Sequence, residues 1–209
     1  MASCLLLDLP GEIRNQIYSH LLILPSHSTP TTLKHHPIYP QILHTCQKIY
    51  EEARQILYGY NVFIAHPNLL SGMPRLRKSF VAFSSPNLIT MIRRYYILVR
   101  LDCDPNFTAK KVQEAFTGVD ELTLEVFQAQ FGGSENQVLK LFEGIRGVKK
   151  ARIYGSVTAF PDYAGWLERA MMTTEGTPLP ILGEEDKTSV RPYDIWIVRG
   201  NLASKGNCG

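Results

Sequence analysis

The chain has 209 residues, of which 44% are hydrophobic and 10% aromatic, and its formal net charge is +3. This composition excludes an intrinsically disordered chain, and the length suits one domain or one domain with a small helical extension. No apolar run approaches the length of a membrane span, and the amino terminus lacks the basic start and small-residue cleavage site of a secretory signal. The sequence therefore predicts an intracellular protein, cytoplasmic or nuclear, that does not enter a membrane.

Two amphipathic helical segments are predicted near the amino terminus, over residues 5–24 and 39–63. In the first, Pro10 suits an opening helical turn, where its missing N–H would be unpaired anyway. The apolar side of the first segment repeats at helical spacing and consists of Ile13, Ile17, Leu21 and Leu24, with Leu22 widening it. The apolar side of the second consists of Ile42, Cys46, Ile49, Ala53, Ile56 and Leu57, which predicts that Cys46 is a core residue.

The first segment resembles the start of an F-box, the helical motif that docks substrate receptors onto the Skp-type adaptor of cullin-RING ubiquitin ligases. The residues that carry this resemblance are Leu9-Pro10-x-Glu12-Ile13, Ile17 and the pair Leu21-Leu22. Together with Thr45-Cys46-Gln47-x-Ile49-Tyr50-x-Glu52-Ala53 and Leu57-Tyr58-x-x-Asn61-x-Phe63, the start is similar to a class of F-box-like proteins of filamentous fungi. The resemblance covers about the first 66 residues, and residues 25–40 stand where a typical F-box has a compact second helix.

The resemblance implies a non-catalytic adaptor for protein interactions, of the kind that serves as a substrate receptor of a cullin-RING ubiquitin ligase. Its docking side chains would lie in an apolar groove of the partner, and they are Leu9, Pro10, Ile13, Ile17, Leu21 and Leu22. An equally open alternative is that this stripe is buried against the second helix and the rest of the fold, because an apolar stripe indicates a core before it indicates an interface.

After residue 66 the sequence predicts short strands that alternate with helices. Residues 95–101 form a nearly continuous apolar and aromatic run, which predicts a strand covered on both faces. Residues 119–127 alternate between apolar and polar, which predicts a half-buried strand. The other predicted elements are helices over 108–116, over 134–145 and over 161–172, strands over 148–154 and 193–199, and an exposed loop over 173–188.

A weak internal repeat links these strand-helix units. Residues 116–124 align with residues 145–153 at a displacement of 29, and residues 92–97 resemble the same junction about 27 residues earlier. Such spacing falls within the range of leucine-rich repeats, although the Leu/Asn ladder of that repeat is missing. Strands joined by helices should run parallel.

The predicted fold is therefore α+β or α/β. The amino-terminal helices pack against a small parallel or mixed sheet of strand-helix units that is weakly leucine-rich-repeat-like. We expect an F-box-like helical region over residues 1–66, an α/β region over 67–199 and a flexible tail over 200–209.

A basic stretch lies between Glu52 and Asp102, where the chain has no acidic residue. It could bind an anion through Arg75, Arg77, Lys78, Arg93 and Arg94. A solvated surface whose counter-charges come from elsewhere in the fold is the favoured interpretation. A nucleic-acid binder with a basic surface stays an alternative function, although the sequence disfavours nucleic acid as a partner.

No motif of a known catalytic or cofactor site occurs in the chain. The six histidines lie in the first third, but His44 and Cys46 fall on different sides of the predicted helix, so one metal ion could not readily use both. The four scattered cysteines form no CxxC pair and favour reduced thiols. The sequence predicts no cofactor and no metal, and an enzyme is disfavoured. A small-molecule binder or cofactor-free enzyme on the same scaffold remains an alternative, because a shaped pocket leaves no motif.

Overall fold

A computed structural model describes residues 5–25, 37–129 and 136–180, and within them the chain forms helices and one mixed five-stranded sheet. The predicted combination of helices with a mostly parallel sheet is confirmed. The helices are α1 (Gly11–Leu22), η2 (Pro40–His44, a 3-10 helix), α2 (Gln47–Tyr60), α3 (Pro86–Ile89), α4 (Ala109–Phe116), α5 (Gln137–Lys140) and α6 (Pro161–Met172). The strands are β1 (Phe63–His66), β2 (Leu70–Arg75), β3 (Arg94–Arg100), β4 (Glu121–Phe127) and β5 (Lys150–Gly155).

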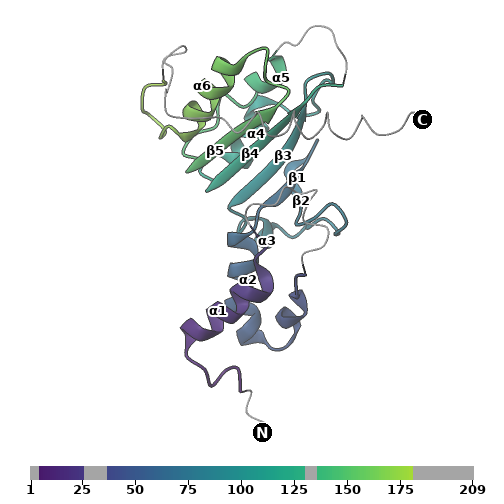
Figure 1. Ribbon diagram of the computed structural model, residues 1–209, viewed down its shortest axis with the longest axis vertical. Coiled ribbons are helices and arrows are strands. Elements are labelled where there is room, and N and C mark those ends of the chain that lie inside the picture. The colour runs from purple at the N-terminus through teal and green to yellow at the C-terminus, as the bar shows by residue number, and fades with distance from the viewer. Residues whose placement is uncertain (1–4, 26–36, 130–135, 181–209) are drawn as a thin grey trace, which may run out of the picture.

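The strands follow the spatial order β2-β1-β3-β4-β5, and β1, β3, β4 and β5 run parallel to one another. Only the β1–β2 pair is antiparallel among the described strands. Figure 1 shows α4, α5 and α6 gathered on one face of the sheet, while α1 and α2 extend from one end of it. The predicted strand over 193–199 and the tail lie outside the described residues.

The displacements of the internal sequence repeat correspond to the register with which neighbouring strands pair in the sheet. Leu122 of β4 lies opposite Ala151 of β5, which reproduces the displacement of 29 residues. Tyr95 of β3 lies opposite Leu122, which reproduces the displacement of about 27. Aligned residues of successive units are therefore hydrogen-bonded neighbours, and their side chains stack across the sheet on the same face.

The two glycines that precede the strands of the repeat have the same left-handed backbone. Gly118 has φ +74° and Gly147 has φ +69°, a conformation that side chains with a Cβ rarely adopt. The two turns also contact each other, because the N–H of Gly118 donates to the carbonyl of Arg146 at 2.9 Å. The repeated glycine therefore sets the turn through which each unit enters its strand.

Among the described residues, the helices of the repeat units cover one face of the sheet and leave much of the other face without a helix. On the covered face, the buried side chains are Tyr95, Ile97, Val99, Leu122, Leu124, Val126, Ala151 and Ile153. On the other face Leu98 is 37% exposed and Arg100 is also exposed. The prediction that strand 95–101 is covered on both faces holds for Tyr96, which is buried on this second face, and is wrong for Leu98 and Arg100, because the described helices of the repeat units all pack on the other side.

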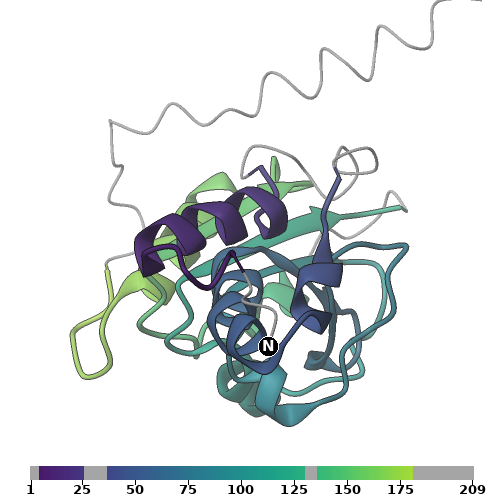
Figure 2. The ribbon, with the colours of Figure 1, turned by 90° about the horizontal axis from the view of Figure 1, so that it is seen from below.

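The amino-terminal helices α1 and α2 contact each other, and Figure 2, which looks from below, shows them on the viewer's side of the sheet. Helix α2 leads directly into β1, and the ring of Tyr58 stacks on the ring of Phe63 with centroids 5.8 Å apart. Tyr18 and Leu22 of α1 belong to the same continuous apolar core as the sheet residues. The helical extension is thus part of one packed structure.

Several local predictions need correction. Cys46 is exposed rather than buried, because it lies at the residue before α2 begins, where its side chain leaves the apolar side of the helix. The helix expected over 134–145 is shorter: α5 ends at Lys140, and turns follow it. The hairpin of β1 and β2 and the short helix α3 were missed.

Candidate functional site

The outward side of α1 is the first candidate site, and its position is fixed by contacts on the opposite side of the helix. Arg14 donates to both carboxylate oxygens of Glu52 on α2, from Nε at 2.9 Å and from Nη2 at 2.7 Å. The hydroxyl of Tyr18 donates to the same carboxylate at 3.0 Å. Arg14 also reaches the carbonyl of Leu9 at 2.5 Å, so the turn before α1 is tied to the same ion pair.

A second anchor joins the far end of α1 to the end of α2. Asn61 is buried, and its side-chain amide donates to the carbonyls of Leu22 at 2.7 Å and of Leu57 at 2.9 Å. Its side-chain oxygen accepts from the N–H of Leu24 at 2.8 Å. One side chain thus satisfies backbone groups at both helix ends, which would otherwise be left without partners in the core.

The predicted docking residues separate into two sides of α1. Leu22 is buried together with Tyr18, so this predicted docking residue faces α2. Ile13 is 41% exposed, and Ile17 and Leu21 are half-buried. Leu22 lies about 180° around the helix from Ile13, since the two are nine residues apart and each residue advances about 100°. The alternative of intramolecular burial therefore holds for Leu22 and does not hold for Ile13.

A shallow apolar groove of about 340 Å³ runs along the outward side of α1. It is lined by Ile13, Gln16, Ile17, His20 and Leu21. Leu9 (37% exposed) and Pro10, both predicted for docking, lie just before the amino-terminal end of the helix and are also exposed. Five of the six predicted docking residues are thus at least partly accessible, and we define the outward face of α1 by them: Leu9, Pro10, Ile13, Ile17 and Leu21.

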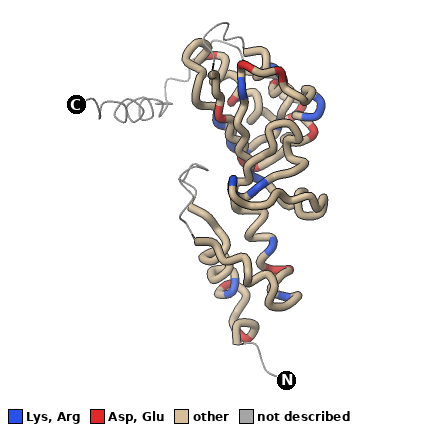
Figure 3. The backbone as a smooth tube through the Cα atoms, turned by 90° about the vertical axis from the view of Figure 1, so that its right-hand side faces the viewer, with Lys and Arg blue, Asp and Glu red and all other residues tan. Residues whose placement is uncertain are grey.

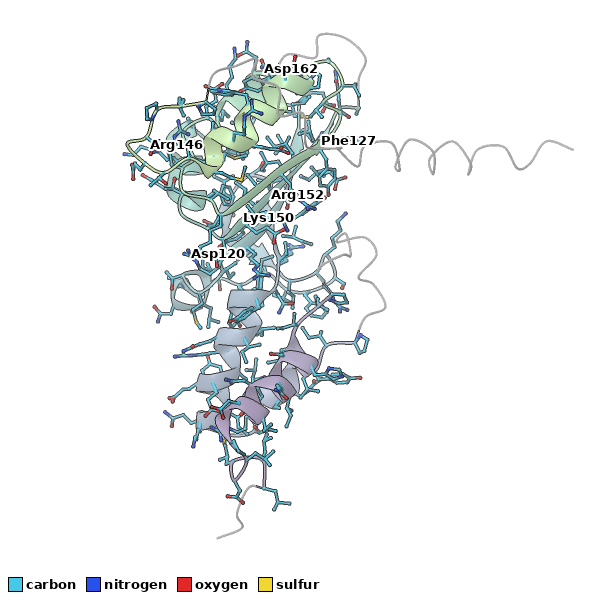
Figure 4. The ribbon with its side chains drawn as sticks, turned by 60° about the vertical axis from the view of Figure 1, so that its left-hand side comes forward. Asp120, Phe127, Arg146, Lys150, Arg152 and Asp162 are labelled. Carbon is cyan, nitrogen blue, oxygen red and sulfur yellow. The ribbon has the colours of Figure 1, made fainter. Side chains whose placement is uncertain are left out.

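The open face of the sheet is a second candidate site, which the sequence analysis did not identify. We define it by the side chains on the sheet face opposite the helices of the repeat units, on three adjacent parallel strands: Arg94, Tyr96, Leu98 and Arg100 on β3, Glu121, Thr123, Glu125 and Phe127 on β4, and Lys150, Arg152 and Tyr154 on β5. Tyr96 is the buried member of this set. Phe127 is 46% exposed. In Figure 4 the labelled Phe127, Lys150 and Arg152 lie on the side of the sheet opposite to α6.

A carboxylate held by two tyrosines lies in the middle of this face. Glu125 accepts a hydrogen bond from the hydroxyl of Tyr96 and another from the hydroxyl of Tyr154 at 3.2 Å. Burial and the hydrogen bond to Glu125 raise the pKa of Tyr96, so this hydroxyl stays protonated and remains a donor. The arrangement orders three neighbouring strands and leaves the surrounding charged side chains to face outward.

The basic residues predicted to bind an anion do not form one site. Arg93 donates to the carbonyl of Gly118 at 2.6 Å and pairs with Asp120 at 3.4 Å. Arg77 lies over the ring of Phe80, 5.4 Å from its centroid. Arg75, Lys78 and Arg94 complete the set, and only the last belongs to the open face as defined. Figure 3 shows Lys and Arg interspersed with Asp and Glu over the part of the chain that contains the sheet.

Within residues 5–25, 37–129 and 136–180, no group of three or more His, Cys, Asp or Glu residues is arranged to hold a metal ion. No helix in the same ranges is long and apolar enough to cross a membrane. The thiols of Cys46 and Cys103 are free and exposed. Comparisons with protein-family models, with curated proteins and with solved structures found no match for this chain.

Proposed function

We propose that this chain is a non-catalytic protein-interaction adaptor, an F-box-like substrate receptor that docks on the Skp-type adaptor of a cullin-RING ubiquitin ligase. The observation that carries the proposal is the partial exposure of the apolar outward face of α1. Ile13 is 41% exposed and borders an apolar groove, although an apolar side chain in the first turn of a helix could have been buried against α2.

The way α1 is held supports this proposal. A docking helix loses less entropy on binding when it is already ordered in the free protein. Arg14, Glu52 and Asn61 fix α1 from its inner side, through contacts that do not involve the side chains of Ile13 and Ile17. The hydrogen bond from Arg14 to the carbonyl of Leu9 also holds the segment that carries Leu9 and Pro10. The outward face of α1 is therefore presented in one arrangement.

The test is co-purification of the full chain with the Skp-type adaptor. We expect the wild-type chain to bind, and Ile13→Asp and Ile17→Asp to weaken binding by about tenfold or more, because each would place a carboxylate in an apolar contact. Val81→Asp is the matched control, since Val81 is a highly exposed apolar residue far from α1 in the sequence, in the loop after β2.

Two results would contradict the proposal. In one, the wild-type chain does not bind the adaptor. In the other, Ile13→Asp and Ile17→Asp bind as well as Val81→Asp does, which would place any contact elsewhere on the chain. Circular dichroism of each variant shows whether a loss of binding reflects a loss of folding instead.

A further inference from the structure

The open face of the sheet carries more positive than negative charge once its internal pairs are taken into account. Lys150 pairs with Glu121 at 3.1 Å, and Arg100 pairs with Asp102 at 2.8 Å. Glu125 is the remaining carboxylate of the face, and it accepts from two tyrosine hydroxyls. The face therefore offers no carboxylate that lacks a hydrogen-bond or ion-pair partner.

Two cations of the same face have no carboxylate partner among the described residues. Arg152 is exposed on β5, and its guanidinium makes no hydrogen bond or ion pair with any described residue. Arg94 on β3 donates to the carbonyl of Tyr60 at 3.1 Å and lies over the ring of that residue, so its charge is not neutralised. The two guanidiniums start from strands two positions apart in the sheet, which corresponds to about 10 Å between backbones.

Apolar side chains of the same face lie farther along β3 and at the end of β4. Leu98 follows Arg94 on β3, and Phe127 lies on β4 opposite Arg100. Both are more than one-third exposed, although large apolar side chains on a sheet are stabilised by being covered. The face thus combines unpaired cations at one end with uncovered apolar side chains toward the other.

We propose that the open face of the sheet is a docking surface for an acidic protein segment that carries apolar side chains. Arg94 and Arg152 pair with its carboxylates, and Leu98 and Phe127 contact its apolar side chains. Charge complementarity selects this partner, because the face has two cations without a carboxylate partner, Arg94 and Arg152, and one carboxylate without a cation partner, Glu125. The surface lies on different elements from the outward face of α1, so the inference goes beyond the proposed docking of the adaptor and is tested separately.

A protein segment fits this face better than a nucleic acid does. Glu125 lies between the two unpaired arginines in the sheet order, and its carboxylate, which no cation offsets, would repel a phosphate backbone laid across the strands. A peptide can place its carboxylates at the arginines and its neutral backbone over Glu125. The tyrosine hydroxyls of the face already donate to Glu125 and are not free to donate to phosphates.

The experiment is fluorescence anisotropy with the full chain and three labelled probes. The probes are a short peptide of Asp, Glu, Leu and Phe, the same peptide with Lys in place of each acidic residue, and an oligothymidine. We expect the acidic peptide alone to bind, with an affinity that falls as salt rises. Arg152→Glu should weaken its binding by about tenfold or more, and should improve binding of the lysine peptide.

Lys110→Glu is the matched control, because it makes the same charge change on the exposed side of α4, on the helix-covered side of the sheet. It should change the affinity for the acidic peptide by no more than about twofold. Ile13→Asp should leave peptide binding intact even if it abolishes binding to the Skp-type adaptor. The proposal is overturned if the acidic peptide does not bind, if oligothymidine binds in its place, or if Arg152→Glu and Lys110→Glu have equal effects.

Discussion

Arg14 and Glu52 form a bidentate ion pair that joins α1 to α2, with nitrogen-to-oxygen distances of 2.9 and 2.7 Å. The same carboxylate accepts from Tyr18, and the same guanidinium donates to the carbonyl of Leu9. Bidentate geometry fixes direction as well as distance. The orientation of α1, and therefore of its outward face, depends on this pair.

The first prediction concerns acid stability. The hydrogen bond from Arg14, helped by that from Tyr18 and opposed by burial, holds the pKa of Glu52 below its usual value. A carboxyl whose pKa is lower in the folded chain than in the unfolded chain stabilises the folded state. This stabilisation is fully present above the pKa of the unfolded chain, about 4.3, and it is lost as the pH falls through the pKa of the folded chain. Urea unfolding at a series of pH values should show this loss, and Glu52→Gln should make the decline shallower.

Glu114→Gln is the control for this experiment, because Glu114 is exposed and pairs only loosely with Lys110, at 3.9 Å. Asp102 and Asp120 also have lowered pKa values, through Arg100 and Lys149, so some decline remains in every variant. If Glu52→Gln and Glu114→Gln give the same pH profile, the ion pair does not stabilise the folded state.

The second prediction concerns Asn61. Asn61→Ala removes three hydrogen bonds and leaves the carbonyls of Leu22 and Leu57 and the N–H of Leu24 without that partner in the core. We expect a loss of about 3 kcal/mol in the free energy of unfolding, measured by urea titration. Asn87→Ala, at an exposed position in α3, should change it by less than about 0.5 kcal/mol. Similar losses in the two variants would show that the buried amide has no special role.

The residues that carried the family resemblance turn out to have roles inside the fold. Glu52 and Asn61 hold α1, and Ala53 is fully buried between the helices and the rest of the core. A sequence motif indicates that certain residue types are needed at certain positions, and it does not distinguish internal contacts from contacts with a partner. This is why the helices were predictable and the accessible side of α1 was not.

The parallel strands were predictable because their signal is periodic, and the hairpin was missed because its signal is not. Residues 121–127 alternate in burial as they alternate in polarity, and the repeat fixed their register. Strand β2 contains Gly72 and Pro74, which usually argue against a strand. It forms at the edge of the sheet, where a proline that cannot donate a hydrogen bond is tolerated.

The open face was missed for a different reason. Residues 95–101 are apolar at nearly every position, and composition alone cannot show that one side of such a strand is left uncovered. The exposure of Leu98 depends on where α4, α5 and α6 pack, which is decided by contacts far apart in the sequence. Cys46 illustrates the same point, because its exposure depends on where α2 begins.

The third prediction concerns Gly155, the last residue of β5. Its φ is +106°, and a Cβ at this position would lie 2.1 Å from the carbonyl oxygen of Val126. Gly155→Ala must therefore displace the end of β5 from β4, and we expect it to lower the free energy of unfolding by about 2 kcal/mol or more. Gly118→Ala also imposes a positive φ but meets no atom within 4 Å, so its cost should be about 1 kcal/mol. If the two variants lose equal free energy of unfolding, the backbone of Gly155 does not approach the carbonyl oxygen of Val126 as described.

The fourth prediction separates the two sides of α1 by their contribution to stability. Leu22 is fully buried against the core, so Leu22→Ala should lower the free energy of unfolding by about 2–5 kcal/mol. Ile13 is 41% exposed, and Ile13→Ala should cost less than about 1 kcal/mol in the same urea titration. The comparison uses similar side-chain truncations nine positions apart on one helix, so differences in helix propensity contribute little. If Ile13→Ala costs as much as Leu22→Ala, Ile13 contributes to the core of the folded chain, and the outward face of α1 loses the exposure on which the docking proposal rests.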